Sequence, residues 1–244
     1  MKSEIFENED GKFIIFPNDA IAQHLKTGKL WEPHFKKVIN ALVPLDNTVV
    51  LDCGANFGYN TVVLAKNLKT TCQIYCFEPQ RIIFQQLAGN LILNNIYNAQ
   101  AINCALGNTD GALELNPVNY ESEWVNIGDT SLGQGGEICN IAQLDSFDLK
   151  QVDFIKLDVQ GSELSVLEGA EKLIERSLPD IFIEIEEHQL AKFNVKKEQI
   201  FDFLKSRGYR IWRIENEYPC DHICVTKDFD RVLSLCTDLN LIEV

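Results

Sequence analysis

The sequence lacks any run of eighteen apolar residues, and its first ten residues contain no apolar segment of the kind that forms the core of a signal peptide. A membrane-spanning helix needs about 20 apolar residues, and a secretory signal needs an apolar segment of roughly 7–15 residues. No internal repeat or low-complexity tract is present either. We therefore expect a cytoplasmic protein that has no membrane segment and no repeat architecture.

Basic residues are scarce. The chain has 22 Lys and Arg against 36 Asp and Glu, which gives a net charge of −14. Proteins draw most of their affinity for nucleic acids from Lys and Arg contacts to phosphates. This charge balance therefore disfavours a nucleic-acid partner. An acidic cleft would instead attract a cationic ligand.

The eight cysteines do not indicate a disulfide framework, because several of them lie inside apolar, strand-like runs. Buried thiols of this kind behave as small apolar side chains. Cys220 and Cys224 flank His222, but no second pair of zinc ligands accompanies them. Two-residue alternation in a short strand explains this spacing without a metal.

Short apolar runs rich in Val, Ile and Phe alternate with segments of helical periodicity along the chain. The predicted strands are 48–53, 73–78, 100–106, 153–159, 180–185, 209–214 and 222–226, and the predicted helices are 60–68, 80–93, 163–176 and 196–207. This alternation predicts a doubly wound, Rossmann-like α/β fold with a mostly parallel sheet that is covered on both faces.

Two stretches depart from this alternation. Residues 1–47 form an N-terminal preface with a helix expected from Glu32 to Ala41. Residues 108–148 contain short alternating segments that predict a β-hairpin insertion. In open α/β sheets the ligand crevice lies at the carboxyl ends of the strands, where such an insertion could cover a substrate. With 244 residues, we expect a single domain composed of this preface, a core over 48–244 and the insertion.

The segment Asp52–Gly58, DCGANFG, follows the first predicted strand of the core and opens a helix. Its glycines allow a tight turn and a close approach of a ligand to the backbone. A dinucleotide site requires Gly-x-Gly-x-x-Gly, whereas Phe57 occupies the position of a required glycine here. We therefore predict that Asp52, Gly54, Asn56 and Gly58 bind an adenosine-type cofactor other than a nicotinamide dinucleotide.

An acidic residue ends the next strand, in Phe77-Glu78-Pro79. Glu78 stands twenty residues after Gly58, where its carboxylate can accept hydrogen bonds from both ribose hydroxyls. Pro79 is placed to pack against the adenine. Ala105, after the third strand, is expected to contribute to the opposite wall of the same site.

Together these segments resemble the FkbM-type family of class I O-methyltransferases. The resemblance covers roughly residues 12–227 and is carried by VLDCGANFGYNT (50–61), FEP (77–79), LDS (144–146) and above all DFIKLDVQGSELSVLEGA (153–170). It implies a seven-stranded methyltransferase fold, S-adenosylmethionine as the methyl donor, and a hydroxyl of a sugar, glycan or small natural product as the acceptor. Gln160 stands where this family more often has Glu.

Charged residues within buried central strands are costly unless they are paired. Lys156 and Asp158 lie two residues apart, on one face of the fourth strand, and Glu184, Glu186 and His188 share one face of the fifth. We expect Lys156 to pair with Glu184, and Asp158, Glu186 and His188 to approach the ligand crevice. Asp158 is the best candidate to orient or deprotonate the acceptor hydroxyl, and His188 is the second.

Several alternatives remain open. A divalent cation held by Asp158 with Glu186 or His188 could acidify the acceptor, but the same cluster can act without a metal, and no metal site is predicted. A purely structural ion pair is the alternative for Lys156 and Asp158. Glu163 is expected to cap a helix. Glu32 is expected to be a solvated carboxylate, and the alternative is that it reaches over the cofactor from the preface. In the insertion, Trp124, Asn126 and Ser131, with Asp129 and Thr130, offer the aromatic and hydrogen-bonding groups that sugar recognition requires.

At the level of function, the alternatives are a methyltransferase for a protein or nucleic-acid acceptor, and a catalytically silent domain that binds S-adenosylmethionine. The oligomeric state does not follow from the sequence.

Overall fold

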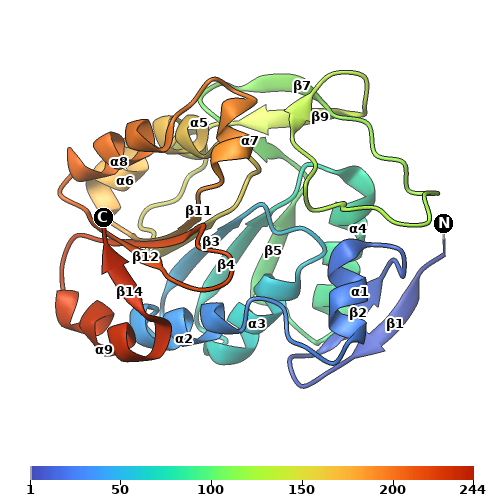
Figure 1. Cartoon of the computed structure of the whole chain (residues 1–244), viewed down its shortest axis with the longest axis horizontal. Helices are drawn as coiled ribbons and strands as arrows, with labels where there is room; N and C mark the ends of the chain where they lie inside the picture. The colour runs from blue at the N-terminus through green and yellow to red at the C-terminus, as the bar shows by residue number, and fades with distance from the viewer. Residues whose placement is uncertain (1) are drawn as a thin grey trace.

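A mixed sheet of eight strands runs through the middle of the computed structural model, which describes residues 2–244 (Figure 1). Its strands, in order across the sheet, are β14 (Leu241–Glu243), β12 (Arg210–Ile214), β13 (Asp221–Val225), β11 (Asp180–Glu184), β10 (Phe154–Leu157), β3 (Val49–Cys53), β4 (Gln73–Phe77) and β5 (Ala99–Ile102). The five strands from β11 to β5 are parallel, and the other three are antiparallel additions.

The α/β fold class is confirmed, but the predicted number of seven strands is corrected to eight. Within the described residues the sheet has an eighth strand, β14, which pairs with β12 at its edge. Only three residues long and largely exposed, β14 offers no alternating apolar pattern in the sequence. β14 joins the sheet through its ladder with β12, and its Leu241 packs against the core.

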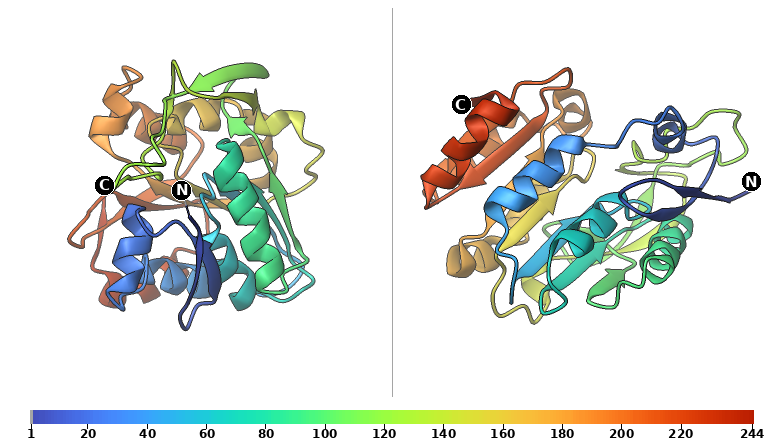
Figure 2. Two further views of the ribbon diagram at one scale, coloured as in Figure 1. Left: turned by 90° about the vertical axis from the view of Figure 1, so that its right-hand side faces the viewer. Right: turned by 90° about the horizontal axis from the view of Figure 1, so that it is seen from below.

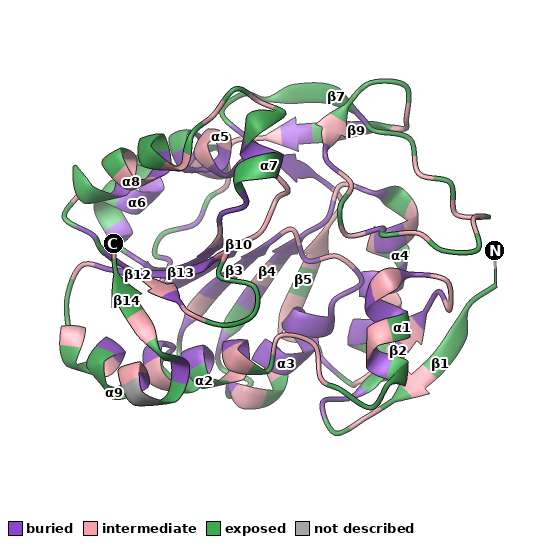
Figure 3. Cartoon of the chain, viewed as in Figure 1, coloured by how far each residue is buried: buried purple, intermediate pink, exposed green. Residues whose placement is uncertain are grey.

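Both faces of the parallel strands are buried, so their residues alternate between two cores (Figure 3). Val50 and Phe154 belong to one core, and Leu51 and Ile155 belong to the other. This is why the central strands are continuous apolar runs. Lys156 is the charged exception within β10 and is 2% exposed.

Helices cover each face of the sheet (Figures 1 and 2). One face carries α2 (Pro33–Leu42), α3 (Tyr59–Asn67), α4 (Arg81–Leu93) and α9 (Phe229–Leu239). The other face carries α5 (Glu163–Glu168), α6 (Glu171–Ser177) and α8 (Lys197–Lys205). Pro33 occupies the first turn of α2, as predicted, because a proline there removes an amide that has no helical partner.

The helix predicted over 163–176 is two helices, α5 and α6. The Asp145 carboxylate, in the short 3-10 helix η1 (Leu144–Ser146), accepts hydrogen bonds from the backbone amides of Lys172 and Leu173. It thereby caps α6 from outside the helix. Gly169 lies at the break against the backbone of Gly107, where a Cβ would stand 1.9 Å from the carbonyl oxygen.

The segment 1–47 contributes a hairpin of β1 (Glu4–Glu7) and β2 (Lys12–Ile15), followed by α1 (Ala20–Lys26) and α2. Backbone amides of β2 donate to side chains of α4, as in Ile14 N to Asn90 Oδ1 at 2.6 Å. Phe13 and Ile15 are buried in the core on this face of the sheet.

The insertion is larger than the predicted hairpin. It forms a four-stranded sheet in the order β6 (Ala105–Leu106), β9 (Ile138–Ala142), β7 (Gly111–Leu115) and β8 (Leu132–Gly133). The predicted strand 100–106 is therefore divided, because β5 ends at Ile102 and β6 joins the second sheet. The hairpin itself is present as the antiparallel pair β7 and β9.

The N-terminal segment and the insertion touch through residues 18–31 and 120–130, which we call the cover. Asn18 donates from Nδ2 to the carbonyl of Ser122, at 2.8 Å. Asp19 caps α1 with one carboxylate oxygen and accepts from the Ile127 amide, at 3.1 Å, with the other. The two segments that interrupt the α/β alternation thus form one layer.

Candidate active site

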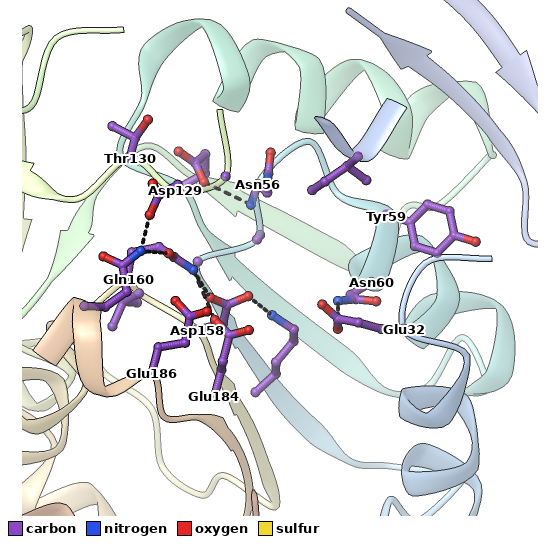
Figure 4. Close-up of a pocket in the computed structure, with 18 of the residues that line it drawn as sticks. Glu32, Asn56, Tyr59, Asn60, Asp129, Thr130, Asp158, Gln160, Glu184 and Glu186 are labelled. Carbon is purple, nitrogen blue, oxygen red and sulfur yellow. Dashed lines mark hydrogen bonds and ion pairs between the residues drawn. The ribbon is translucent and has the colours of Figure 1, made fainter. Parts of the chain in front are cut away.

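A cavity of about 790 Å³ lies at the carboxyl ends of the parallel strands, within the roughly 300–1,000 Å³ range of ligand pockets. Its walls come from the turn after β3, the ends of β4, β10 and β11, the start of β13 and the cover. Figure 4 shows the side chains that converge there. The crevice predicted from the order of strands is therefore a real cavity.

The turn after β3 brings the backbone to the edge of this cavity. Gly54 has φ 82°, and a Cβ on it would stand 1.7 Å from the carbonyl oxygen of Asp158. The amides of Gly54 and Ala55 both donate to the carbonyl of Phe77. Gly58, at φ 88°, begins α3 against Leu87. The two glycines are required for different contacts, and Gly54 is the one that lines the cavity.

Asp52 does not line the cavity, although the sequence predicted it to bind the cofactor. It is fully buried, and one carboxylate oxygen accepts from the Thr61 hydroxyl at 2.6 Å. Burial raises its pKa. Its position indicates a role in holding the turn to α3, and Gly58 does not line the cavity either.

Glu78 lies at the end of β4, 4% exposed, and lines the cavity. Its two carboxylate oxygens each accept one backbone amide, from Asn56 and from Gln80, both at 2.9 Å. Burial raises its pKa to about 7. The carboxylate is thus fixed by the glycine turn itself, while each oxygen retains a second acceptor site.

Pro79 and Ala105 also line the cavity, on the side of Glu78, as predicted from their positions in the sequence. Asn103 fixes this wall by donating from Nδ2 to the carbonyls of Glu78 and Pro79, at 2.8 and 3.0 Å. Asn56, Gly54, Glu78, Pro79 and Ala105 therefore surround one half of the cavity, which we call the donor half.

Asp158 follows β10 and lies next to the glycine turn, since its amide donates to the carbonyl of Cys53 at 3.0 Å. Its carboxylate accepts from Lys156 Nζ at 3.1 Å. Burial disfavours the charge of each group, yet their attraction keeps the pKa of Lys156 above and that of Asp158 below its ordinary value. The prediction that Lys156 pairs with Glu184 is wrong. Within the described residues, the ion pair of Lys156 is with Asp158.

Gln160 connects the two neighbouring carboxylates (Figure 4). Its Nε2 donates to Asp158 Oδ1 at 2.8 Å and to Glu184 Oε2 at 3.2 Å. Burial and the charge of Asp158 raise the pKa of Glu184 well above its ordinary value. Gln189 donates to Gln160 in turn and also to Asp129 in the cover. A hydrogen-bonded chain thus runs from Asp158 to the cover.

The prediction that Glu184, Glu186 and His188 share one face of a strand is wrong. β11 ends at Glu184, and His188 lies in the short helix α7 (Glu187–Ala191). The His188 side chain is 68% exposed, with Nε2 3.6 Å from a carboxylate oxygen of Glu186. Glu186 is 9% exposed, and both residues line the cavity. His188 stands at its rim rather than beside Asp158.

The insertion residues separate into two groups. Asn126, Asp129 and Thr130 line the cavity. Trp124 and Ser131 do not: Trp124 is 58% exposed, and the Ser131 hydroxyl accepts from Asn116 within the second sheet. These two residues, which were expected to bind substrate, therefore lie outside the lining of this cavity.

Glu32 is not the solvated carboxylate that the sequence suggested. It precedes α2 with φ 44°, lines the cavity and accepts from Asn60 Nδ2 at 2.8 Å. His34 and Asp221 line the same wall and pair at 2.7 Å. Sequence reasoning missed His34 and Asp221, because α2 and β13 meet only in the folded sheet.

Glu163 acts on a loop rather than only on its own helix. Its Oε1 accepts from the amides of Val159 and Gly161, and it is 2% exposed. The described residues contain no group of three or more His, Cys, Asp or Glu side chains arranged to hold a metal ion. The metal-assisted alternative thus has no support in the geometry.

The substitution Glu32→Gln is expected to raise the Tm of the free protein at pH 8. Burial raises the pKa of Glu32 to about 7, above the ordinary 4.5. A carboxyl with a raised pKa makes its full contribution to the free energy of unfolding below pH 4.5. This contribution is lost as the pH rises through 7. Because glutamine stays neutral and keeps an acceptor for Asn60, its advantage should fade as pH falls from 7 toward 4.5.

Thermal melts across this pH range test the titration of Glu32. The exposed Glu175 in α6 supplies the matched control, since Glu175→Gln removes the same charge far from the cavity. A Tm difference for Glu32→Gln that stays constant with pH would contradict the assigned burial effect.

A family model described as the methyltransferase FkbM domain matches residues 52–211. The chain belongs to the FkbM methyltransferase family. The match includes the glycine turn, Glu78, Asp158 and Glu184, and leaves Glu32, His34 and Asp221 outside. In this FkbM protein the additional wall of the cavity is therefore built by segments beyond the matched region.

The chain is also similar to individual proteins that are named as methyltransferases. The chain is 28% identical to Methyltransferase 1 of Beauveria bassiana, over 51% of this chain and 59% of that protein. It is 24% identical to Methyltransferase sdnD of Sordaria araneosa, over 72% and 78% of the two chains. The crystal structure of Methyltransferase FkbM from Methylobacillus flagellatus superposes with a TM-score of 0.53 at 20% identity, covering 75% of this chain and 45% of that one. The chain thus spans less than two thirds of two of these proteins.

Nothing in the described residues forms a helix that is both long and apolar enough to span a bilayer.

Proposed function

We propose that this FkbM protein transfers a methyl group from S-adenosylmethionine to a hydroxyl of a small acceptor, a sugar, glycan or natural product. The observation that carries this proposal is the position of Asp158. It lies against the glycine turn in the same cavity as Glu78, so a proton acceptor stands next to the donor half. Family membership supports the methyl transfer, and the chemistry of Asp158 supports oxygen as the acceptor atom.

The donor half fits an adenosine-containing donor. Glu78 offers two oxygens with free acceptor sites to the ribose hydroxyls, and Pro79 and Ala105 offer apolar surface to the adenine. The turn at Gly54 has no side chain that would separate its backbone from the ligand. When bound, the donor supplies a methyl group on a cationic sulfonium.

Asp158 performs the chemistry that the chain itself must provide. Its carboxylate would accept the proton of the acceptor hydroxyl, and the donor, when bound, would supply the methyl group to that oxygen and leave as the neutral thioether. Lys156 and Gln160 hold the carboxylate in place through one oxygen each. Because the carboxylate is fixed, it would orient the acceptor hydroxyl as well as remove its proton.

Nucleic-acid acceptors fit this cavity poorly. Eight carboxylate side chains line it, against one lysine and no arginine among the described lining residues. Phosphate groups would be repelled by such a wall. The electrostatics therefore favour a small acceptor without phosphate.

Calorimetric titration tests the donor directly. The protein should bind S-adenosylmethionine and fail to bind NAD, whereas the reverse result would overturn the proposal. Incubation with labelled S-adenosylmethionine and fractionated cell extract, followed by identification of the labelled product, then names the acceptor.

The variant Glu78→Ala is expected to weaken S-adenosylmethionine binding by about 10–150-fold, since hydrogen bonds to a charged group contribute about 1.5–3 kcal/mol. Glu175→Ala is the control of equal charge change. Circular dichroism and melting curves must show a folded variant, because the amides of Asn56 and Gln80 lose their acceptor. Equal affinity in the Glu78→Ala variant and the parent protein would remove the ribose assignment.

A further inference from the structure

We propose that the acceptor carries an ammonium group beside the methylated hydroxyl, and that Glu32 and Glu184 bind this group. The inference rests on the proposed methyl transfer and specifies its acceptor class. It depends on the half of the cavity that lies away from Glu78, which we call the acceptor half.

The acceptor half is assembled by elements that are far apart in the sequence. Glu184 ends β11 directly opposite Asp221 of β13 in the ladder. Asp158 and Lys156 follow on the neighbouring strand β10, and Glu32 enters from the start of α2. All five side chains line the same cavity. A ligand in this half therefore meets charged groups from four elements.

The positive charges in this half are already paired. Lys156 Nζ contacts Asp158 at 3.1 Å, and His34 Nε2 contacts Asp221 at 2.7 Å. The charge of Asp221 and its hydrogen bond hold the pKa of His34 above its ordinary value, although burial opposes this. Each of these two carboxylates has its own cation.

Neither Glu32 nor Glu184 has a cation as an ion-pair partner among the described residues, and Glu184 also shares a side-chain hydrogen bond with Asp158. Glu32 accepts from the Asn60 amide at 2.8 Å, and Glu184 accepts from the Gln160 amide at 3.2 Å. A carboxylate taken out of water without a cation is costly. Accordingly, burial and the neighbouring carboxylates raise the pKa of both residues, that of Glu32 to about 7. A ligand ammonium would supply the missing positive charge to both.

A second observation points to a bound ligand in this cavity. Ser162 lines it and is only 5% exposed, and its buried Oγ has no hydrogen-bond partner within the protein. Buried polar groups are nearly always paired, so a polar ligand group is the missing partner. The described residues show no metal-binding group of three or more side chains. An organic cation that also carries hydroxyls would supply a positive charge to Glu32 and Glu184 and a hydrogen-bond partner to Ser162.

Matched probes test this inference by calorimetry. D-glucosamine and D-glucose are titrated into the protein saturated with S-adenosylhomocysteine, because the two sugars differ at one position by an ammonium and a hydroxyl. We expect glucosamine to bind about tenfold or more tightly, the ratio that corresponds to one charge-assisted hydrogen bond. Glu184→Gln and Glu32→Gln should each reduce this preference, and Glu175→Gln should leave it unchanged.

The outcomes separate the two proposals. If S-adenosylhomocysteine binds and glucosamine shows no preference over glucose, the ammonium inference is wrong while the donor assignment stands. If S-adenosylhomocysteine does not bind, the proposed function fails as well. A preference that survives both Glu184→Gln and Glu32→Gln would place the ammonium elsewhere. Unchanged S-adenosylhomocysteine affinity in these variants confirms that they are folded.

Discussion

The Asp158→Asn variant is expected to lose turnover by about 10²–10⁴-fold, the contribution of a positioned general base, while its affinity for S-adenosylmethionine stays close to that of the parent protein. Asparagine has nearly the same shape and keeps a carbonyl oxygen for Lys156. It cannot take the proton from the acceptor hydroxyl. The loss should therefore appear in kcat rather than in donor binding.

Steady-state kinetics with the labelled acceptor, together with calorimetry of donor binding, measure the two effects separately. Glu186→Gln provides a comparison within the same cavity, because Glu186 has no contact with Lys156 among the described ion pairs. Turnover retained in Asp158→Asn would leave the Asp158–Lys156 pair with a structural role only. A melting curve guards against simple unfolding.

The second large effect is expected for Gly54→Ala, which should abolish detectable donor binding and lower Tm. The new Cβ would stand 1.7 Å from the backbone oxygen of Asp158, so β3 and β10 would have to separate at their carboxyl ends. This displacement moves the amides that hold Glu78 and also the carboxylate of Asp158. Both halves of the cavity would lose their geometry together.

Gly28 is a matched control for the backbone. It has the same φ of 82°, but nothing lies within 4 Å of its would-be Cβ. Gly28→Ala thus measures the cost of left-handed backbone alone, about 1–2 kcal/mol, or roughly 2–8 °C in Tm for a chain of this size. If Gly54→Ala matched Gly28→Ala in Tm and still bound the donor, the close approach of the two strands would not matter.

The parts of the site that follow local patterns could be predicted from the sequence. Glu78 and Asp158 each end a strand with an unmistakable apolar run, and the strand order of an α/β sheet brings such ends together. Gly54 and Asn56 follow from the turn that the motif requires. These four residues lie at the cavity, as predicted.

The errors arose where tertiary contacts override local periodicity. Alternating polar residues suggested that the strand continued to His188, but β11 ends at Glu184 because the chain turns into α7. Lys156 pairs along its own strand rather than across to Glu184. His34 and Asp221 were not predicted, and Glu32 was expected to be solvated. The contact between these residues depends on how α2 packs near β13. No spacing within the sequence encodes that contact.

The hydrogen bonds that join Asn18 and Asp19 to the insertion constrain how the cover can be exchanged between FkbM relatives. A chimera that exchanges only residues 120–130 would replace the backbone amide of Ile127, which donates a hydrogen bond to the Asp19 carboxylate. Residues 18–31 and 120–130 must therefore be exchanged together for a hybrid protein to keep the hydrogen bonds of the cover.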